Sequence, residues 1–564
     1  MNQPTFQLPA LPARMVWLIA LIVFCTLLFG YRLGERDLWS SHEGRAGQNA
    51  RAIVEEGCWG LPHLCDFRAE LQKPPLYYWL VALVSHVRGG VVDALSVRVP
   101  AALAGVLVVL LTCGLLWNGG RWRAGLLAAF TLATMVHFTA LARTGRIDMP
   151  LAGSVSCCLV TYYLGWQRTL DGKRAWPCWL LAAFSCAAAI LLKGPIGIVL
   201  PAAVVGLHLL FESVLARRLS YLREPQSDSG ARGALALGIA TGLSSGGSRP
   251  RLKSKSASVG DSRSGLVATS CVDTRRAIRQ ALLALLWLLP VILLLALPWF
   301  LWANHRTGGA LWETFFLYHN VERAFGAGAE LRSYPFWYYL PRLAIDLLPW
   351  SLLLPVALWQ LVRQRSFRRD ADARFGLVWL LAMLLALSCA GFKRADYLLP
   401  LYPGVALILG CWLDDWLGRR DVRPVRLAVA TFLLAGCFLA GWGYYAAQVL
   451  PAAEPSRDRQ AFARVIRQHA PKPGLVIFFR CEDHALAFHV GGPINTILEW
   501  ENIDTWAGRP GTHYIVMPPD CARLWQDHVR QGRLEVVADN LPHDEPLILL
   551  RTLPLQKSAP ARRQ

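Results

Sequence analysis

Eleven long apolar runs dominate this chain and restrict the folds open to it. A helix that crosses a bilayer needs about 20 mostly apolar residues. Inside the bilayer every backbone polar group must be bonded within the protein, so such runs form helices. The sequence therefore predicts a polytopic α-helical membrane protein with about eleven, and up to thirteen, transmembrane helices. The runs lie near 15–31, 98–117, 124–142, 150–167, 177–192, 195–211, 282–302, 336–361, 375–391, 397–416 and 425–447.

A shorter apolar run over 76–87 contains Tyr77, Tyr78, Trp79 and His86. Its length and its aromatic and polar residues favour a helix in the membrane interface over one that spans. The positive-inside rule supports this assignment. With eleven spans and the N-terminus inside, the Arg-rich loops fall on the inner side, and a twelfth span at 76–87 would turn most of them outward.

The charge balance excludes nucleic acid as a partner. The formal net charge is +20, but only 17% of residues are charged and 54% are hydrophobic. The basic residues occupy short loops between apolar runs, as is typical of a membrane protein. The run at 15–31 has no small-residue cleavage site after it, so we expect a retained signal anchor.

The chain divides into four predicted regions. Residues 1–211 form an N-terminal transmembrane catalytic core whose outer loop covers 32–97, and residues 212–281 form a cytoplasmic, disordered loop. Residues 282–450 form further transmembrane helices, and 451–564 form a periplasmic α/β domain. In that domain, 474–480, 512–517 and 546–551 read as buried strands, and 457–469 and 521–531 as helices.

Polar residues gather at one end of many of the predicted spans, which places them on the outer face. Ionisable residues within spans are usually functional. Their convergence on one side predicts a reaction centre at the border of water and lipid. These residues are Glu43, Lys73, Asp148, Lys193, His319, Glu322, Lys393, Arg394 and Tyr397.

Two carboxylates are candidate bases. Glu43, beside His42, falls in the first turn of a helix capped by Ser40 or Ser41, where it can accept a proton from a hydroxyl or simply favour the helix dipole. Asp148 begins the fourth span, where an unpaired carboxylate is costly. Its structural partners would be Arg143 and Arg146, nearby in the chain.

Several cations are candidate phosphate ligands. Lys73 precedes two prolines that hold it at headgroup depth, although a lone interfacial Lys more often snorkels to the surface. Lys193 and the Lys393–Arg394 pair lie in two hairpins of the same face, with Tyr397 close by, and can share an anionic ligand. The alternative is two ordinary snorkelling turns. The segment 315–325 either lines the cavity or forms an amphipathic surface helix.

Taken together, these segments resemble the GT-C glycosyltransferases that use polyprenyl-phosphate sugars. The pattern is most similar to the lipid A aminoarabinose transferases and the related protein O-mannosyltransferases. The matching segments follow the family's order: HEGR at 42–45, GCWGLP at 57–62, QKPPLYYW at 72–79, RIDMPL at 146–151, LLKGP at 191–195, PFWYYLP at 335–341 and FKRADYLLPLYP at 392–403.

This resemblance implies a GT-C fold and an inverting transfer of a sugar from a polyprenyl-phosphate carrier to a lipid or protein acceptor. Lys73, Lys193, Lys393, Arg394 and Tyr397 would bind the donor phosphate, and Arg45, Tyr77, His319, Asn320 and Glu322 would line the cavity. The family's Asp before Glu43 is His42 here, so the base is Glu43 or Asp148, or the acceptor is activated differently. The family's later His falls at Asn320, with His319 adjacent, and this difference does not favour a metal site there. A divalent metal is allowed, and no cofactor is required.

We therefore expect a multi-pass glycosyltransferase of the inner membrane with its active site on the periplasmic face. A transporter would place charges near the midplane and show repeats, and a lipid-binding scaffold would need the cations without the carboxylates. Neither sequence repeats nor a Cys/His zinc spacing is present. If the outer face is oxidising, Cys58–Cys65 and Cys481–Cys521 are candidate disulfides.

Overall fold

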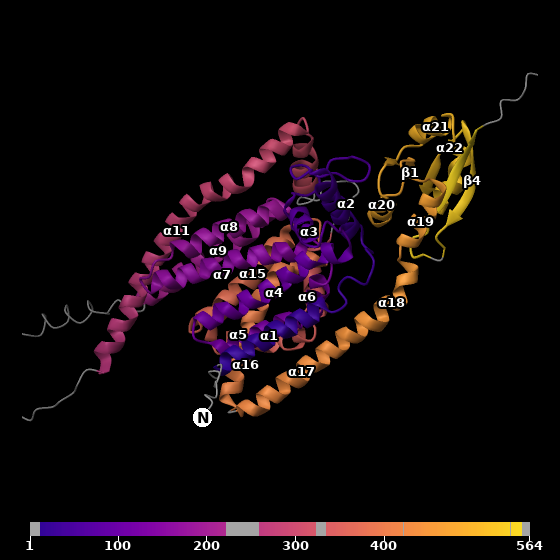
Figure 1. The fold of residues 1–564 in the computed structure, drawn as a ribbon. Coiled ribbons are helices and arrows are strands. Elements are labelled where there is room, and N and C mark those ends of the chain that lie inside the picture. The colour runs from indigo at the N-terminus through magenta and orange to yellow at the C-terminus, as the bar shows by residue number, and fades with distance from the viewer. Residues whose placement is uncertain (1–11, 222–258, 323–333, 421, 542, 555–564) are drawn as a thin grey trace, which may run out of the picture.

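The computed structural model of the 564-residue chain describes residues 12–221, 259–322, 334–420, 422–541 and 543–554. A bundle of helices makes up most of it, and a small domain with a β-sheet lies at one end (Figure 1). The helices of the first half are α1 (Ala13–Gly30), α2 (Ser41–Glu56), α3 (Leu76–Val87), α4 (Ala94–Asn118), α5 (Trp122–Ala133), α6 (Val136–Ala142), α7 (Asp148–Leu170), α8 (Trp176–Lys193) and α9 (Ile196–Tyr221).

The second half of the bundle contains several short or irregular helices between the long ones. Seven of those in the described residues are 3₁₀ turns or π-helical segments, labelled η1 to η7. The elements are α11 (Val259–Arg306), the π-helix η1 (Trp312–Glu322), η2 (Phe336–Tyr338), α13 (Tyr339–Asp346), η3 (Trp350–Leu352), α14 (Leu354–Arg363), η4 (Ser366–Arg368), α15 (Ala371–Cys389), η5 (Ala395–Leu401), α16 (Tyr402–Arg419), α17 (Pro424–Tyr444), η6 (Tyr445–Val449), α18 (Leu450–Ala453) and η7 (Glu454–Ser456).

The chain is a multi-pass membrane protein. Among the described residues, seven helices are long and apolar enough to cross a membrane, and nine if each of two bent pairs counts as one span. The eleven apolar runs all fold as helices. The two outside this count are α1, whose apolar part is short, and α7, whose Ser, Thr and Tyr residues lower its hydropathy. Figure 1 shows α11 and α17 flanking the bundle.

The two bent pairs support each other. α5 and α6 meet at 72°, and the helices on either side of 347–349 meet at 117°. The amide of Val136 in the first break donates to the carbonyl of Leu348 in the second, at 3.0 Å. Trp350 donates its indole N–H to Thr134 at 2.9 Å. Each break frees backbone groups that the bilayer cannot satisfy, and the other break supplies partners.

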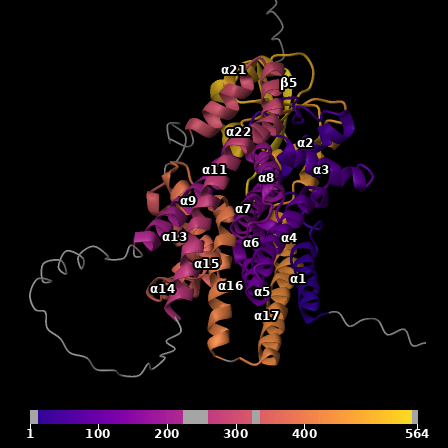
Figure 2. The ribbon, with the colours of Figure 1, turned by 90° about the vertical axis from the view of Figure 1, so that its left-hand side faces the viewer.

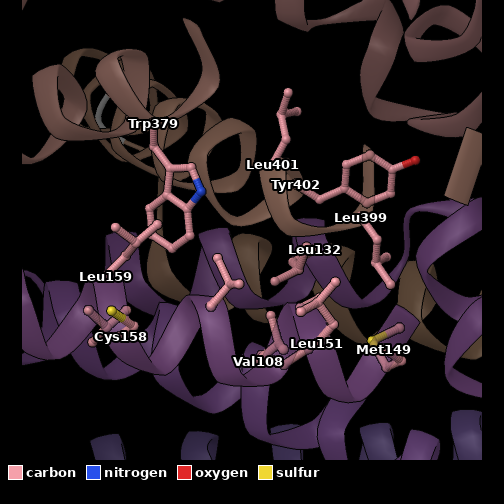
Figure 3. Packing of buried hydrophobic residues seen from close by; sticks show 14 of the residues in the cluster. Val108, Leu132, Met149, Leu151, Cys158, Leu159, Trp379, Leu399, Leu401 and Tyr402 are labelled. Atoms are coloured by element: carbon pink, nitrogen blue, oxygen red, sulfur yellow. The ribbon is translucent and has the colours of Figure 1, made fainter. Parts of the chain in front are cut away.

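The core lies where α7 packs against α15 and α16 (Figure 3). Leu159 of α7 lies near Trp379 in Figure 3, and the Trp379 indole donates to the carbonyl of Pro400 at 2.9 Å. α15 and α16 approach each other so closely at Gly376 and Gly404 that a Cβ on Gly404 would lie only 3.0 Å from the carbonyl oxygen of Gly376. This packing fixes the ends of α7 and η5, which carry site residues.

The sequence predicts a cytoplasmic, disordered loop over residues 212–281, and the structure describes only the two ends of that segment. α9 continues to Tyr221 and α11 begins at Val259, so both ends of the 212–281 segment are helical. The middle of that segment lies outside the described residues. The polar stretches at both ends continue neighbouring apolar helices, which sequence composition alone did not reveal.

The C-terminal domain is a mixed α/β structure, as expected. Its five strands lie in the order β2-β1-β3-β5-β4, in which β1 is parallel to both neighbours and the β3–β5 and β5–β4 pairs are antiparallel. The strands are β1 (Val476–Phe479), β2 (Ile494–Ile497), β3 (Tyr514–Met517), β4 (Gly532–Asp539) and β5 (Ile548–Pro554), and the helices are α19 (Gln460–His469), α20 (His484–Val490), α21 (Trp500–Ala507) and α22 (Pro519–His528).

The buried central strand β1 explains how this domain packs. Alternate side chains of a strand point to opposite faces. Val476 and Phe478 enter the core with α19 and α20, whereas Ile477 and Phe479 enter the core with α21 and α22. Figure 2 shows this domain at the end of the bundle near α2.

Candidate active site

Two adjoining cavities lie at the end of the bundle nearest the C-terminal domain. The first, here the apolar cavity, has a volume of about 150 Å³, and the second, here the polar cavity, about 160 Å³. The apolar cavity is lined by Gln72, Lys73, Asp148, Leu151, Lys193, Ile196, Leu200, Phe315, His319, Asn320, Tyr339, Ala386, Leu387, Ala390, Phe392, Asp396, Tyr397 and Pro400. The polar cavity is lined by Ser41, His42, Arg45, Ala46, Gln72, Lys73, Tyr77, Tyr78, Arg146, Ile147, Asp148, Lys193, Arg394 and Tyr397.

Five residues line both cavities and form their shared wall: Gln72, Lys73, Asp148, Lys193 and Tyr397. They come from the segment before α3, the N-terminus of α7, the C-terminus of α8 and η5. Four of the five were predicted from sequence, and Gln72 was not. The wall therefore brings together segments that are far apart in the chain.

Asp148 and Lys193 form an ion pair within the shared wall. The ammonium of Lys193 also lies 4.2 Å from the centre of the Tyr397 ring. Arg146 lies 3.5 Å from Asp148, whereas Arg143 instead donates to the carbonyls of Leu28 and Tyr31. Only one of the two expected arginine partners therefore contacts Asp148.

A second carboxylate, Asp396, lies at the centre of the cationic groups. It accepts from Arg146 at 2.7 Å and from Arg394 at 3.3 Å, and His137 Nε2 lies 3.4 Å away. Sequence reasoning missed Asp396, although it stands inside the FKRADY segment that drew attention to Arg394. An acidic residue two positions after the Lys393–Arg394 pair, in the same hairpin, was the available signal.

His42 lies at the rim of the polar cavity and its side chain is exposed there. Arg394 lies 3.4 Å from its Nε2 atom. Desolvation and the guanidinium groups of Arg146 and Arg394 lower the pKa of His42 to about 4. The imidazole is therefore neutral at pH 7 and has a lone pair available.

Glu43 lines neither cavity and is fully buried. Arg98 binds it in a bidentate pair at 2.7 and 3.1 Å, Arg36 adds a contact at 3.2 Å, and the Gly145 amide donates at 2.9 Å. Burial raises the pKa of Glu43, but Arg98 and Arg36 outweigh it and lower the pKa to about 2. The Ser40 hydroxyl caps the helix by accepting from the Glu43 amide.

Arg98 was not predicted from sequence. It is buried in α4 and donates to the carbonyls of Leu33, Arg36 and Asp37 as well as to Glu43. An ionisable residue at the start of an apolar run was the signal for it. Its partner lies 55 residues away in the sequence, so the pattern did not identify the pair.

Two other predicted residues lie outside both cavities. Lys393 is buried and donates to the carbonyls of Tyr334 and Ala390. Glu322 ends η1. His319 and Asn320 of the same helix do line the apolar cavity, and Asn320 donates to the Phe315 carbonyl at 2.6 Å.

Arg45 connects the polar cavity with the C-terminal domain. It lies 3.4 Å from Glu70 and 2.8 Å from His484 Nε2. Burial and Arg45 lower the pKa of His484 to about 3, so the neutral imidazole accepts from the guanidinium. Tyr78 donates to Glu70 at 3.2 Å, and Tyr77 donates to the Val97 carbonyl at 2.8 Å. Glu70 and His484 were not predicted.

Metal-ligating residues do not gather in either cavity among the described residues. Among the residues that the structure describes, one group of three His, Cys, Asp or Glu side chains is placed to hold an ion, and it lines neither cavity. It consists of Glu56, Cys58 and His63. The cysteines of the two candidate disulfides, Cys58–Cys65 and Cys481–Cys521, are all free in the structure. These disulfide predictions are therefore not met.

Known proteins similar to this chain use lipid-linked sugars. Residues 72–225 match the family described as dolichyl-phosphate-mannose-protein mannosyltransferase. The undecaprenyl phosphate-alpha-4-amino-4-deoxy-L-arabinose arabinosyl transferase 1 of Pseudomonas fluorescens strain Pf0-1 is 25% identical over 428 residues, which are 75% of this chain and 62% of that protein. The corresponding transferase 1 of Sodalis glossinidius is 27% identical over 451 residues, 76% of this chain and 66% of that protein.

Solved structures show the same fold. ArnT from Cupriavidus metallidurans, determined with undecaprenyl phosphate, matches with a TM-score of 0.66 and 18% identity over 95% of this chain and 98% of its own. The oligosaccharyltransferase AglB from Archaeoglobus fulgidus matches with a TM-score of 0.50 and 12% identity over 97% of this chain and 75% of its own. The sequence matches and the shared fold confirm that this chain resembles the GT-C glycosyltransferases, in the group of lipid A aminoarabinose transferases and protein O-mannosyltransferases.

Proposed function

We propose that this protein is a membrane glycosyltransferase that moves a sugar from a polyprenyl-phosphate carrier to an acceptor. The similar arabinosyl transferases favour an undecaprenyl-phosphate pentose as donor and a lipid, such as lipid A, as acceptor. The protein mannosyltransferase family that residues 72–225 match keeps a protein acceptor as the second candidate.

The observation that carries this proposal is the charge of the polar cavity. Five cations line it (Arg45, Lys73, Arg146, Lys193 and Arg394) and exceed the three carboxylates that pair with them, Asp148 on the wall and Asp396 and Glu70 behind it. Such an excess at the end of a membrane bundle favours an anionic ligand. The apolar cavity behind the shared wall offers Leu151, Ile196 and Leu200 to an isoprenoid tail.

The shared wall suits the phosphate that links tail and sugar. In the reaction an acceptor oxygen attacks the anomeric carbon, and the bond from that carbon to the phosphate oxygen breaks. The phosphate leaves with the electron pair and so gains a second negative charge. Lys193 and Lys73 would stabilise that charge, and the Tyr397 ring holds the Lys193 ammonium in place. A single displacement inverts the anomeric centre.

The structure favours two of the three candidate bases. Glu43 is enclosed by guanidinium groups and faces neither cavity, so we assign it a structural role. Asp148 lines both cavities, and His42 is neutral and exposed at the rim of the polar one. A hydroxyl acceptor would give up its proton to His42 or Asp148, and a phosphate acceptor would need no base.

We place this chemistry on the extracytoplasmic face of a bacterial inner membrane. The positive-inside distribution of Arg and Lys supports that orientation. The cavities also share their end of the bundle with the C-terminal domain (Figure 1).

A transfer assay with matched lysine variants tests the proposal. Purified protein in detergent is incubated with radiolabelled undecaprenyl-phosphate aminoarabinose or polyprenyl-phosphate mannose, together with lipid A or a membrane extract. We expect transfer by the wild type and by Lys173→Ala, whose lysine sits in an exposed loop beside Asp171. Lys193→Ala should lose it.

Four outcomes separate the alternatives. Loss of sugar transfer in Lys193→Ala, while the wild type and Lys173→Ala keep it, supports a glycosyltransferase. Lipid binding without transfer from any donor would favour a scaffold, and movement of an unreacted lipid across vesicles containing the protein would favour a transporter. Equal transfer by both lysine variants would overturn the assignment of the shared wall.

A further inference from the structure

The loop that follows α2 brings together three side chains of types that bind transition metals. Glu56 ends α2, Cys58 follows it after Gly57, and His63 begins the hairpin of residues 62–70. One ligand atom from each lies within 4.8 Å of the others. Carboxylate, thiolate and imidazole together are a donor set typical of Zn²⁺, whereas Mg²⁺ and Ca²⁺ favour oxygen ligands.

The hydrogen bonds of His63 show that its ring is oriented for this role. Its Nδ1 atom lies 2.9 Å from the carbonyl of Leu64, and its Nε2 atom lies 2.9 Å from Glu56 Oε2. A neutral imidazole has one N–H and can serve only one of these acceptors. A carbonyl that binds Nδ1–H leaves the Nε2 lone pair pointing at the carboxylate, which is how metal-binding histidines are usually held.

The backbone fixes the three residues before any ion arrives. Gly57 has a left-handed backbone with φ of 74°, and the amides of Gly57 and Cys58 close the end of α2 by donating to Ile53 and Ala52. In the hairpin, Leu64 donates to Arg68 and Glu70 donates to Pro62. Thus Glu56, Cys58 and His63 sit on two short, well-bonded segments.

The loop is also held from outside. The indole of Trp299 in α11 donates to the Gly60 carbonyl at 2.8 Å, and a Cβ on Gly60 would lie 2.3 Å from the ring of Trp302. Only glycine permits this approach. The loop therefore cannot swing away, and the side chain of Glu56, about half exposed, remains free to turn toward an ion.

We propose that Glu56, Cys58 and His63 form a Zn²⁺-binding site, with water in the fourth position. Zinc bonds of about 2.0–2.3 Å would place the ligand atoms roughly 3.5 Å apart, which a rotation of Glu56 allows. The ion would join the end of α2 to the hairpin. α2 carries His42 and Arg45, and the hairpin carries Glu70, which contacts Arg45. This proposal does not depend on the proposed function.

Thiol labelling of the full-length protein in detergent tests the site. The protein is stripped with a chelator, supplied with Zn²⁺ or Mg²⁺, and treated with a maleimide, and the rates at Cys58 and Cys521 are read by peptide mass spectrometry. We expect Zn²⁺ to slow labelling of Cys58 by about tenfold or more and Mg²⁺ to leave it unchanged. Cys521 in the C-terminal domain is the internal reference.

Zinc affinity, measured by competition with a zinc indicator, gives the second readout. Glu56→Gln, His63→Gln and Cys58→Ser should each weaken binding by about tenfold or more. The matched control is Glu55→Gln, whose carboxylate is exposed and lies near Arg51 instead. Unchanged labelling of Cys58 with Zn²⁺, or equal affinity in all variants, would overturn the site and leave an ion pair between His63 and Glu56.

Discussion

Two clusters of ion pairs lie close together in this protein, and they treat their carboxylates in opposite ways. In the first, Glu43 is sealed between Arg98 and Arg36, and its oxygens accept from guanidinium and amide groups. In the second, Asp148 pairs with Lys193 while remaining on the wall of both cavities. The first cluster can only hold segments together, whereas the second can meet a ligand.

This difference shows that burial and pairing alone do not mark a site. Both carboxylates begin helices, and both looked alike in the sequence. What separates them is access: one group faces a cavity and the other does not. Substitutions in one cluster should therefore change stability, and substitutions in the other should change activity.

The largest effect is expected from Arg98→Ala. Removing the guanidinium leaves Glu43 buried without its main partner, and breaking a buried pair in this way costs about 3–5 kcal/mol of folding free energy. Thermal unfolding in detergent measures it, with Arg363→Ala, an exposed arginine of α14, as the control. Stability equal to the control would show that the first cluster does not hold the fold.

Low pH should abolish the contribution of Glu43 to the free energy of unfolding. Its pKa is lowered from 4.5 to about 2, so the folded state favours the charged form and the stability is fully present above about pH 4.5. It is lost as the pH falls toward 2, by roughly 3 kcal/mol in total. Denaturant unfolding at several pH values should show the gap between wild type and Glu43→Gln closing over that range. A gap independent of pH would contradict the sealed ion pair.

Asp148→Asn should affect activity more than stability. The variant keeps the shape of the side chain but removes the charge that positions Lys193, and we expect transfer to fall by about a hundredfold. The assay of sugar transfer measures this, alongside a melting temperature close to that of the wild type. Asp171→Asn, in an exposed loop, is the control. Full activity in Asp148→Asn would show that the reaction does not need the ion pair of Asp148 and Lys193.

The smallest effect is expected at the contact between the cavity and the C-terminal domain. His484→Ala removes the acceptor for Arg45, and we expect donor KM to rise by about tenfold, since a hydrogen bond to a charged group contributes about 1.5–3 kcal/mol. His484→Gln restores an acceptor and should recover most of the loss. An equal defect in the exposed control His469→Ala, or no recovery with Gln, would indicate a general structural effect.

The sequence predicted the bundle well because the bilayer imposes a strong rule on composition. Apolar runs such as 98–117 must be helices in lipid, so their length suffices to identify them. The length of the apolar runs could not show that α9 and α11 continue past them, because the polar extensions of these helices contain no apolar run. In the C-terminal domain, the edge strand β4 was missed for the same reason, since its exposed side chains carry no buried pattern.

The site was predicted in part. Lys73, Asp148, Lys193 and Tyr397 each lie at the end of an apolar run, and all four meet at the shared wall. The roles of Glu43 and Lys393 depend on what surrounds them in three dimensions. Glu43 pairs with Arg98, and Lys393 donates to the carbonyls of Tyr334 and Ala390. Every residue has a backbone carbonyl, so the sequence does not show which carbonyls will accept from Lys393.

The contact of α2 with α20 has a consequence for how the protein is made. Arg45 and His484 meet although 439 residues separate them in the chain. A Cβ on Gly44 would also lie 2.5 Å from the Ala485 amide, so the two helices touch through their backbones. At about 5–20 residues per second of synthesis, the N-terminal half waits roughly 20–90 s for the partner that completes one side of the cavity. During this interval the side-chain amide of Gln48 lacks the acceptor that it has in the finished protein, the carbonyl of His484.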